Sequence, residues 1–313
     1  MKEFLRGNAF LDVGRYIVEL IIVDDFSSDK LCETVKELAD NLEKCFAEVV
    51  CVRHARNLGR AAARNTGLSL AKGDGVLFLD CDGILEKDYV VKLIHYAQHN
   101  PNVSIRGNRR VDSRLTIKSS YLRYFDSRFL GARVEKKVFP FNLQNLSPNF
   151  FATGEMYVPR NHLLAVNGFD EKFQTYGCED EDLGWRLFRI GIPLHFAYDL
   201  HVTDIDDLAT IRRAVDRMAK YAEFSLPVLL KSHPDAMSKS PVPLVEKHGG
   251  LVTQNRVLSS IFVGLLYVFQ RPLLRLVEIL DSFALPNIVV SAVNKVLLGS
   301  AYFIGYLKRK REV

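Results

Sequence analysis

The stretch Val76-Leu-Phe-Leu-Asp-Cys-Asp82 (VLFLDCD) joins a short apolar run to two carboxylates, and it decides the class of fold. Such a short run predicts a buried strand over Val76–Asp80 that ends in acids. Immediately upstream, Ala61–Ala71 is alanine-rich and helical in pattern, and the segment Lys72–Gly75 breaks it. A helix that leads into a buried strand is the building unit of an α/β protein.

The same alternation extends in both directions along the chain. The apolar, β-branched run Ile17–Val23 predicts a first strand, Leu31–Phe46 a helix and Glu48–His54 a second strand. Beyond the central strand, Lys87–His99 is expected to be helical. We therefore expect an α/β fold with a doubly wound, mostly parallel sheet, whose ligand crevice lies beyond the carboxyl ends of the strands.

The second half of this region is less regular. Asn102–Asn149 is rich in arginine and is interpreted as one strand with helices and loops on the substrate side. It is followed by a predicted strand around Met156–Val158, a helix at Arg160–Val166 and an acidic helix at Glu179–Ile190.

Composition sets limits on the class of protein. The chain has 313 residues, of which 48% are hydrophobic and 25% charged, so it can bury a sizeable core. Its net charge of +5 is mild, and we expect no nucleic-acid partner. The five cysteines form no C-x-x-C pair, which argues against a disulfide framework or a zinc site and favours a reducing compartment. The first residues lack an apolar secretory core, so the active site is expected to face the cytoplasm.

Two acidic motifs could carry chemistry. A turn that starts at Asp80 would let Asp80 and Asp82 approach one Mg²⁺ or Mn²⁺, which would neutralise a diphosphate leaving group. Acids after a strand are also ordinary turn formers, so this motif alone is weak. The alternative interpretation of the four consecutive acids Glu179–Asp182 is N-terminal helix capping, which explains one or two acids more easily than four. A carboxylate held there could act as the general base for an acceptor hydroxyl.

Single residues near these motifs admit alternatives. His201 follows the aromatic segment PLHFAYDL and could complete a metal site begun by Asp82, with His195 as the competing candidate. Arg186 is expected to pair with a preceding acid at helical spacing. Trp185 is interpreted as a core residue rather than a sugar platform.

Five motifs in this order resemble the family-two glycosyltransferases of the GT-A fold. Beyond the two acidic motifs, the likeness rests on Val23–Asp29 (VDDFSSD), Asn57–Gly67 (NLGRAAARNTG) and Gly168–Glu171 (GFDE). It covers about Val18 to His201. The resemblance implies an inverting transferase that moves a sugar from a UDP- or similarly activated donor to a glycan or lipid-linked acceptor, with Mn²⁺ or Mg²⁺.

The resemblance also implies roles for individual residues. It assigns Asp24 or Asp25 to the nucleobase or ribose, Arg64 to the nucleotide, Asp80 to the ribose and metal, Asp82 and His201 to the metal, Asp180 to the catalytic base and Glu179 to sugar or acceptor hydroxyls. Asp182 is the reserve candidate for the base.

The beginning of the chain departs from this family, whose first strand and its base-contacting segment have no match here. We therefore expect an N-terminally truncated catalytic domain over residues 1–231. The rival hypothesis is a catalytically impaired, transferase-like domain that binds a sugar nucleotide or a membrane. A nucleotidyltransferase ranks lower, because it does not need the acidic helix.

The remaining third is interpreted as a helical stretch Asp206–Leu230, a linker at 232–250 and a helical tail at 251–313. The tail is strongly apolar but interrupted, and none of its segments is a clean span of about twenty residues. Its arginines and the closing Lys308–Arg311 favour in-plane binding to an anionic membrane, at the inner face of the cell membrane. The alternative is a helical hairpin packed on the catalytic domain.

Overall fold

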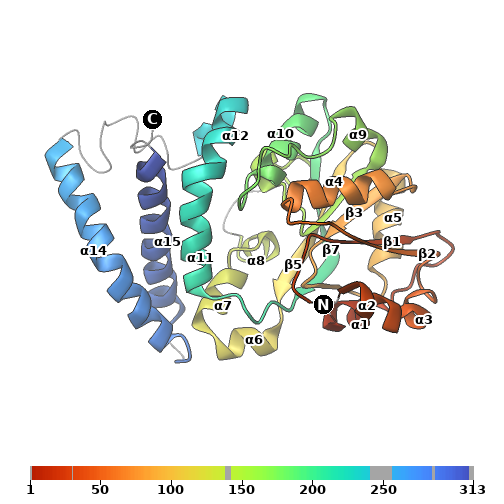
Figure 1. Ribbon diagram of the computed structural model, residues 1–313, viewed down its shortest axis with the longest axis horizontal. Coiled ribbons are helices and arrows are strands. Elements are labelled where there is room, and N and C mark those ends of the chain that lie inside the picture. The colour runs from red at the N-terminus through yellow and green to blue at the C-terminus, as the bar shows by residue number, and fades with distance from the viewer. Residues whose placement is uncertain (1, 30, 138–141, 240–255, 284–285, 310–313) are drawn as a thin grey trace. The chain divides into compact units, whose positions relative to one another are not determined.

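The computed structural model describes residues 2–29, 31–137, 142–239, 256–283 and 286–309 (Figure 1). The strands are β1 Glu19–Asp24, β2 Glu48–Arg53, β3 Gly75–Leu79, β4 Gly83–Leu85, β5 Ser104–Val111, β6 Glu155–Pro159 and β7 Leu194–Asp204. The helices are α1 Lys2–Asn8, α2 Leu31–Glu37, α3 Ala39–Leu42, α4 Arg60–Leu70, α5 Tyr89–His99, α6 Ser113–Lys118, α7 Ser120–Asp126, α8 Leu130–Glu135, η1 Pro148–Phe150, α9 Arg160–Ala165, α10 Glu179–Arg189, α11 Ile211–Lys220, η2 Tyr221–Ser225, α12 Leu226–Ser232, η3 Pro234–Lys239, α14 Arg256–Leu280 and α15 Asn287–Arg309.

The chain divides into two compact units. The first contains residues 1–112, 128–174 and 179–206, and the second contains residues 113–127, 175–178 and 207–313. The expected boundary after residue 231 stays a prediction, and most of the expected linker lies outside the described residues. The candidate site residues named above all belong to the first unit.

The first unit holds two sheets. Strands β1 and β2 form a parallel pair, and a five-stranded sheet has the order β3-β6-β5-β7-β4. In the larger sheet only β5 and β7 run parallel, and the other neighbours are antiparallel. The α/β class is therefore confirmed, but the sheet is mixed rather than mostly parallel. Apolar patterning identifies a strand, whereas the direction of its neighbours depends on connections that patterning does not report.

The two sheets share one apolar core. Leu20 and Ile22 of β1 belong to the same cluster as Leu77 and Leu79 of β3, together with buried residues of α1 and α5. Within the described residues, β1 pairs only with β2, and β3 pairs only with β6. The sheet is thus divided between β1 and β3, although both parts cover the same core.

Most expected elements lie within two residues of their predicted positions. The main differences are at Leu31–Phe46, which forms two short helices instead of one, and at Asp206–Leu230, where the first helix begins only at Ile211. In addition, an eleven-residue strand at Leu194–Asp204 was not expected. This strand, β7, is buried along most of its length, so its apolar-aromatic run reflects a position between β5 and β4.

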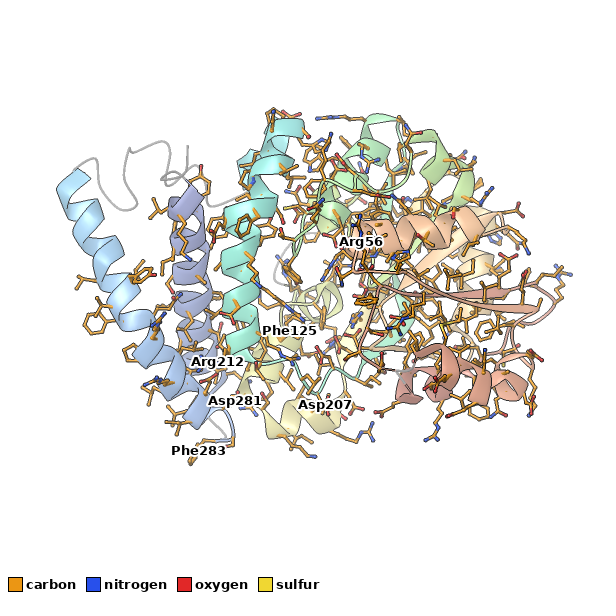
Figure 2. All side chains as sticks on the ribbon, in the orientation of Figure 1. Arg56, Phe125, Asp207, Arg212, Asp281 and Phe283 are labelled. Carbon is orange, nitrogen blue, oxygen red and sulfur yellow. A yellow bond between two sulfur atoms is a disulfide. The ribbon has the colours of Figure 1, made fainter. Side chains whose placement is uncertain are left out.

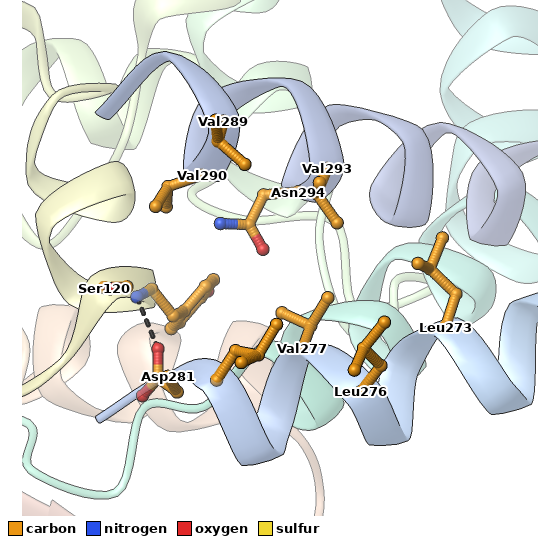
Figure 3. A pocket seen from close by; sticks show the side chains of 11 residues that line it. Ser120, Leu273, Leu276, Val277, Asp281, Val289, Val290, Val293 and Asn294 are labelled. Carbon is orange, nitrogen blue, oxygen red and sulfur yellow. Dashed lines mark hydrogen bonds between the residues drawn. The ribbon is translucent and has the colours of Figure 1, made fainter. Parts of the chain in front are cut away.

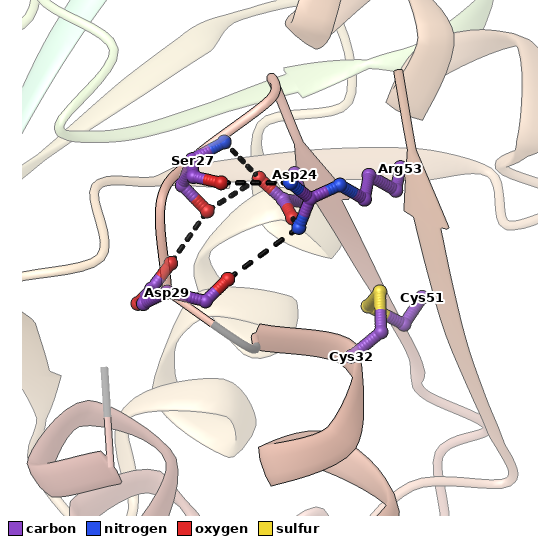
Figure 4. Close-up of a disulfide and its surroundings, with 6 residues drawn as sticks. All are labelled: Asp24, Ser27, Asp29, Cys32, Cys51 and Arg53. Carbon is purple, nitrogen blue, oxygen red and sulfur yellow. Dashed lines mark hydrogen bonds and ion pairs between the residues drawn. A yellow bond between two sulfur atoms is a disulfide. The ribbon is translucent and has the colours of Figure 1, made fainter. Parts of the chain in front are cut away.

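A disulfide between Cys32 and Cys51 contradicts the expectation of none (Figure 4). It joins α2 to β2 across a Cα–Cα distance of 5.8 Å. The nineteen-residue separation gave no recognisable framework, because the pairing depends on α2 packing beside β2. Cys45, Cys81 and Cys178 are not in disulfides.

Hydrogen bonds and close packing join the helices of the second unit. The Asp281 carboxylate accepts from Tyr121 N (2.6 Å) and Ser119 Oγ (2.6 Å), which joins the end of α14 to the start of α7. At Gly305 the backbone of α15 approaches the Ala219 carbonyl so closely that a side chain would collide with it. These contacts hold α7, α11, α14 and α15 together within this unit.

Helix α15 differs from the expectation that no segment forms a continuous span. Within the described residues, Asn287–Lys308 is long and apolar enough to cross a membrane by length and composition, with a mean hydropathy of 1.6. In this structure 44% of that window is buried. A buried core helix passes the same test, so the helix gives only weak support for membrane association.

A cavity of about 90 Å³ lies between α7, α14 and α15 (Figure 3). Its lining is mostly valine and leucine, and Asn294 of α15 points into it. Asn294 is 1% exposed, and no group in the described part of the chain bonds its Oδ1. A buried amide oxygen without a partner in an apolar cavity lowers stability.

We expect Asn294→Leu to stabilise the protein by about 1 kcal/mol, because it removes the unpaired oxygen and keeps the side-chain volume similar. Thermal unfolding should show a higher Tm than that of the unsubstituted protein. Asn287→Leu makes the same change at an exposed position of α15 and should leave the Tm nearly unchanged. A lower Tm for Asn294→Leu would show that the amide makes a favourable interaction.

Candidate active site

Arg64 of α4 joins the two acidic motifs. Its Nη1 lies 2.9 Å from Glu179 Oε1 and 3.0 Å from Asp180 Oδ1, and its Nη2 lies 3.3 Å from Asp80 Oδ1. Burial opposes the charge, but Asp180, Asp80 and Glu179 outweigh it and raise the pKa of Arg64. Two motifs about one hundred residues apart in the sequence therefore meet at a single guanidinium.

Asp180 is held in place yet remains accessible. Its Oδ1 accepts from Thr153 Oγ1 (2.8 Å) and its Oδ2 from Thr153 N (3.2 Å), while 23% of its side chain is exposed. The reserve candidate, Asp182, is 3% exposed in its side chain and pairs with Arg186, as the helical spacing predicted. Of these two carboxylates, Asp180 is therefore the one that a substrate can reach.

Glu179 is buried, with 1% of its side chain exposed. Burial and then the neighbouring Asp180 raise its pKa to about 7, although Arg60 and Arg64 lower it. Its Oε1 pairs with Arg64, and no group in the described residues bonds its Oε2. In this structure Glu179 pairs with Arg64, and its expected contact with sugar or acceptor hydroxyls stays a prediction.

Asp80 and Asp82 are the more accessible acids, with 48% and 33% of their side chains exposed. Asp82 pairs with Arg109 of β5, and Arg109 Nε also donates to Asp204 Oδ2 at 2.9 Å. Glu155 lies beside them and pairs with Arg106 at 3.0 Å. The second acid of the D-x-D motif thus lies in a network of buried charges.

Asp24 and Asp25 bond to neighbouring protein groups (Figure 4 for Asp24). Asp24 is 2% exposed and accepts from Ser27 N (2.8 Å) and Arg53 Nη1 (2.9 Å). Asp25 accepts from the backbone amides of Leu58 and Gly59 at 2.8 Å each, and so holds the loop before α4. Both carboxylates organise the edge beside α4, and their expected contact with a nucleotide stays a prediction.

His201 does not join the D-x-D acids. Its Nδ1 lies 3.3 Å from Asn108 Nδ2, its ring packs against Tyr198, and its backbone pairs with Asn108. His195, the alternative, is 7% exposed and bonds to Tyr96. No group of three or more candidate ligands forms a metal site in the described residues. The expected role of His201 as a metal ligand stays a prediction, and in this structure Asp204 of β7, not His201, bonds Arg109.

The acids that remain can still hold a hard divalent ion. Mg²⁺ is commonly bound by one or two carboxylates, with water and substrate phosphate as the other ligands. The exposed carboxylates of Asp80 and Asp82 satisfy this requirement. The network also has a deficit of positive charge, because six carboxylates and four guanidinium groups carry a formal charge of −2 when all are ionised. They are Asp80, Asp82, Glu155, Glu179, Asp180, Asp204, Arg60, Arg64, Arg106 and Arg109.

Several residues of this network were not singled out by sequence reasoning. Arg109 and Arg106 were noted only as part of a basic region, and Thr153, Glu155 and Asp204 were not noted. One signal was available: Thr153-Gly154-Glu155 places a glycine directly before a strand. A Cβ at Gly154 would lie 2.7 Å from Arg109 Nη1 and 3.1 Å from Asp80 Oδ2, so the site needs glycine there.

The raised pKa of Glu179 predicts how stability depends on pH. Since the native state holds this proton up to about pH 7, whereas the unfolded chain loses it near pH 4.5, stability falls as pH rises between these values. Glu179→Gln removes this loss, so the variant should be more stable at pH 8, by up to about 3 kcal/mol, and equally stable at pH 4. Urea unfolding at both pH values measures the difference.

The exposed Glu43→Gln is the matched control and should behave like the unsubstituted protein at both pH values. A Glu179→Gln variant that is less stable at pH 8 would show that the ionised carboxylate, paired with Arg64, is the favoured form.

Two protein-family models match parts of the chain. Residues 8–152 match the glycosyl transferase family 2 model, and residues 132–210 match the N-terminal domain of galactosyltransferase. None of the curated proteins matches the chain.

The fold is similar to solved glycosyltransferase structures. Mannosyltransferase PcManGT from Pyrobaculum calidifontis, solved with GDP-Man and Mn²⁺, has a TM-score of 0.60 and 16% identity, over 98% of this chain and 83% of that chain. Residues 1–349 of S. aureus TarS, solved with UDP-GlcNAc, have a TM-score of 0.50 and 13% identity, over 99% and 87%. Residues 8–152 therefore belong to glycosyl transferase family 2, within a chain that has the GT-A fold of glycosyltransferases.

Proposed function

We propose that this protein is an inverting glycosyltransferase that moves a sugar from a nucleotide-diphosphate donor to a glycan or lipid-linked acceptor. The observation that carries the proposal is the position of Arg64, which contacts the phosphate-side acid Asp80 and the base-side acid Asp180. A displacement at the anomeric carbon needs its leaving group and its base on opposite sides of one small space. The two ends of Arg64 mark such a space.

In this proposal Asp180 is the general base. The acceptor hydroxyl attacks the anomeric carbon, its proton passes to the Asp180 carboxylate, and the bond between that carbon and the β-phosphate oxygen breaks. Thr153 fixes the orientation of Asp180 through two hydrogen bonds. Glu179 positions Arg64, and among the described residues Asp180 is the accessible carboxylate that pairs with Arg64 on the base side. A single base is what inversion requires.

Asp80 and Asp82 would hold Mn²⁺ or Mg²⁺ on the donor side. Such an ion supplies positive charge that stabilises the diphosphate as it leaves. The solved relatives support this choice of cofactor and donor, because PcManGT is described with GDP-Man and Mn²⁺ and TarS with UDP-GlcNAc. UDP sugars are the first donors to test, followed by GDP sugars.

Donor hydrolysis, in which water replaces the acceptor, tests this proposal without knowledge of the acceptor. We expect Mn²⁺-dependent hydrolysis of at least one nucleotide sugar, lost on chelation with EDTA. Asp180→Asn should lower the rate by about 100-fold or more, since it removes the base. The exposed Asp199→Asn makes the same change elsewhere in the first unit and should retain full activity. Equal rates for both variants would rule out Asp180 as the base.

One observation favours the rival proposal of a domain that binds a sugar nucleotide without turnover. Strands β1 and β3 each have one pairing partner in the described residues, so the sheet beside the expected nucleotide pocket is divided. Under the rival, calorimetry would detect nucleotide-sugar binding while no donor is hydrolysed. Under the main proposal, binding and hydrolysis occur together.

We also propose that the second unit associates with an anionic membrane surface at the inner face of the cell membrane. Large apolar side chains are exposed on its two long helices: Leu265, Tyr267, Val268, Phe269, Leu276 and Ile279 on α14, and Ile288, Val289 and Val296 on α15. Exposed Arg271 and Arg275 lie on α14 with them.

One observation opposes the cytoplasmic location that an inner-face position implies. The Cys32–Cys51 disulfide is typical of an oxidising compartment, whereas the cytoplasm is reducing.

Cosedimentation with vesicles tests the membrane proposal. The protein should bind vesicles that contain phosphatidylserine more tightly than neutral vesicles. Arg271→Glu combined with Arg275→Glu should weaken that binding by about tenfold or more, because each basic residue near such a surface contributes about 1 kcal/mol. Lys36→Glu in α2 combined with Lys44→Glu, two residues after the end of α3, changes two exposed lysines of the first unit and should alter the binding little. Equal binding by the two double variants would contradict the proposal.

A further inference from the structure

Arg109 is a buried guanidinium surrounded by four carboxylates. It is 7% exposed, donates from Nε to Asp204 Oδ2 at 2.9 Å and pairs through Nη2 with Asp82. Its Nη1 lies 3.8 Å from Asp80 Oδ2 and 3.8 Å from Glu155 Oε2. A guanidinium keeps its positive charge in proteins at any ordinary pH. The side chain is therefore a permanent cation beside the D-x-D acids.

The surroundings hold this guanidinium in place. Asp204 Oδ1 accepts from the backbone amide of Asp206 at 2.9 Å, so the acid on one side is fixed. On another side, the Gly154 carbonyl accepts from Arg109 Nη1 at 3.4 Å, and the absence of a Cβ at Gly154 leaves room for the guanidinium. The contact with Asp82 is thus part of a built network and not that of a mobile surface arginine.

A divalent ion at Asp82 must compete with this arrangement. A carboxylate that already pairs with a guanidinium attracts a metal ion less strongly, because the positive guanidinium repels the ion at contact distance. We propose that Arg109 is the resident counter-cation of Asp82 and keeps the affinity of the donor-free protein for divalent ions low. This inference rests on the proposed role of Asp80 and Asp82 as ion ligands, but it concerns ion binding and not turnover.

Calorimetric titration of the full chain with MnCl₂ alone tests the inference. Arg109→Gln should bind Mn²⁺ at least tenfold more tightly than the unsubstituted protein, because it frees Asp82 and raises the net negative charge. Arg110→Gln is the matched control, since Arg110 is the next residue of β5 and pairs instead with Glu135 at 2.8 Å. It should bind Mn²⁺ as the unsubstituted protein does. Equal Mn²⁺ affinity for the two variants would overturn the inference.

Two further variants keep the test decisive if Arg109→Gln does not fold. Arg109→Lys keeps the charge, but a single ammonium cannot span Asp82 and Asp204 as the guanidinium does, so Mn²⁺ affinity should rise by about threefold or more. In the unsubstituted background, Asp82→Asn should change Mn²⁺ affinity less than twofold, because Arg109 already occupies Asp82. A tenfold loss on Asp82→Asn would show that Asp82 binds the ion despite Arg109, and the inference would fail.

The ion-binding test and the hydrolysis test can fail separately. If no nucleotide sugar is hydrolysed while Arg109→Gln gains Mn²⁺ affinity, the transfer reaction is wrong and the competition stands. If hydrolysis occurs but Arg109→Gln and Arg109→Lys bind Mn²⁺ no more tightly than the unsubstituted protein, the transfer reaction stands and the competition is wrong.

Discussion

Charge balance at one edge of the first unit is the constraint on which the rest of the structure depends. Six carboxylates from β6, α10, β7 and the segment that follows β3 come together there, and most of them are buried or half-buried. Carboxylates in such numbers repel one another and are costly to desolvate unless cations lie among them. Arg64 from α4 and Arg106 and Arg109 from β5 supply those cations. The site therefore depends on both β5 and α4.

The acids around Arg109 and the acids around Arg64 differ in how far they are exposed. Around Arg109 the acids are tied to a buried side chain, and burial raises the pKa of both Glu155 and Asp204. Around Arg64 the acids face more open space, since Asp80 and Asp180 are partly exposed. Glu179 combines the two situations, because it is buried like the acids around Arg109 but pairs with Arg64. A rigid, charged interior thus supports a more accessible surface.

The second unit has a different physical character. Its helices are joined by a few polar contacts, such as that of Asp281 with the start of α7, and they leave large apolar side chains exposed on α14 and α15. Exposed apolar area of this kind is typical of a surface that contacts a partner or a membrane. The first unit contains the network of carboxylates and guanidinium groups, and the second exposes apolar side chains.

The sequence by itself determined the local features of this protein. Short apolar runs fixed β1, β2 and β3, alanine-rich and amphipathic patterns fixed α4 and α5, and helical spacing fixed the Asp182–Arg186 pair, because each depends on residues close together in the chain. The D-x-D acids and the acidic run were found for the same reason. The tertiary structure alone decided what lies beside them: the mixed direction of the larger sheet, the Cys32–Cys51 disulfide, the placement of His201 with Asn108, and the pairing of Arg109 with Asp82 and Asp204. Those contacts join residues that only strand order and direction bring together, and no periodicity in the sequence encodes that order.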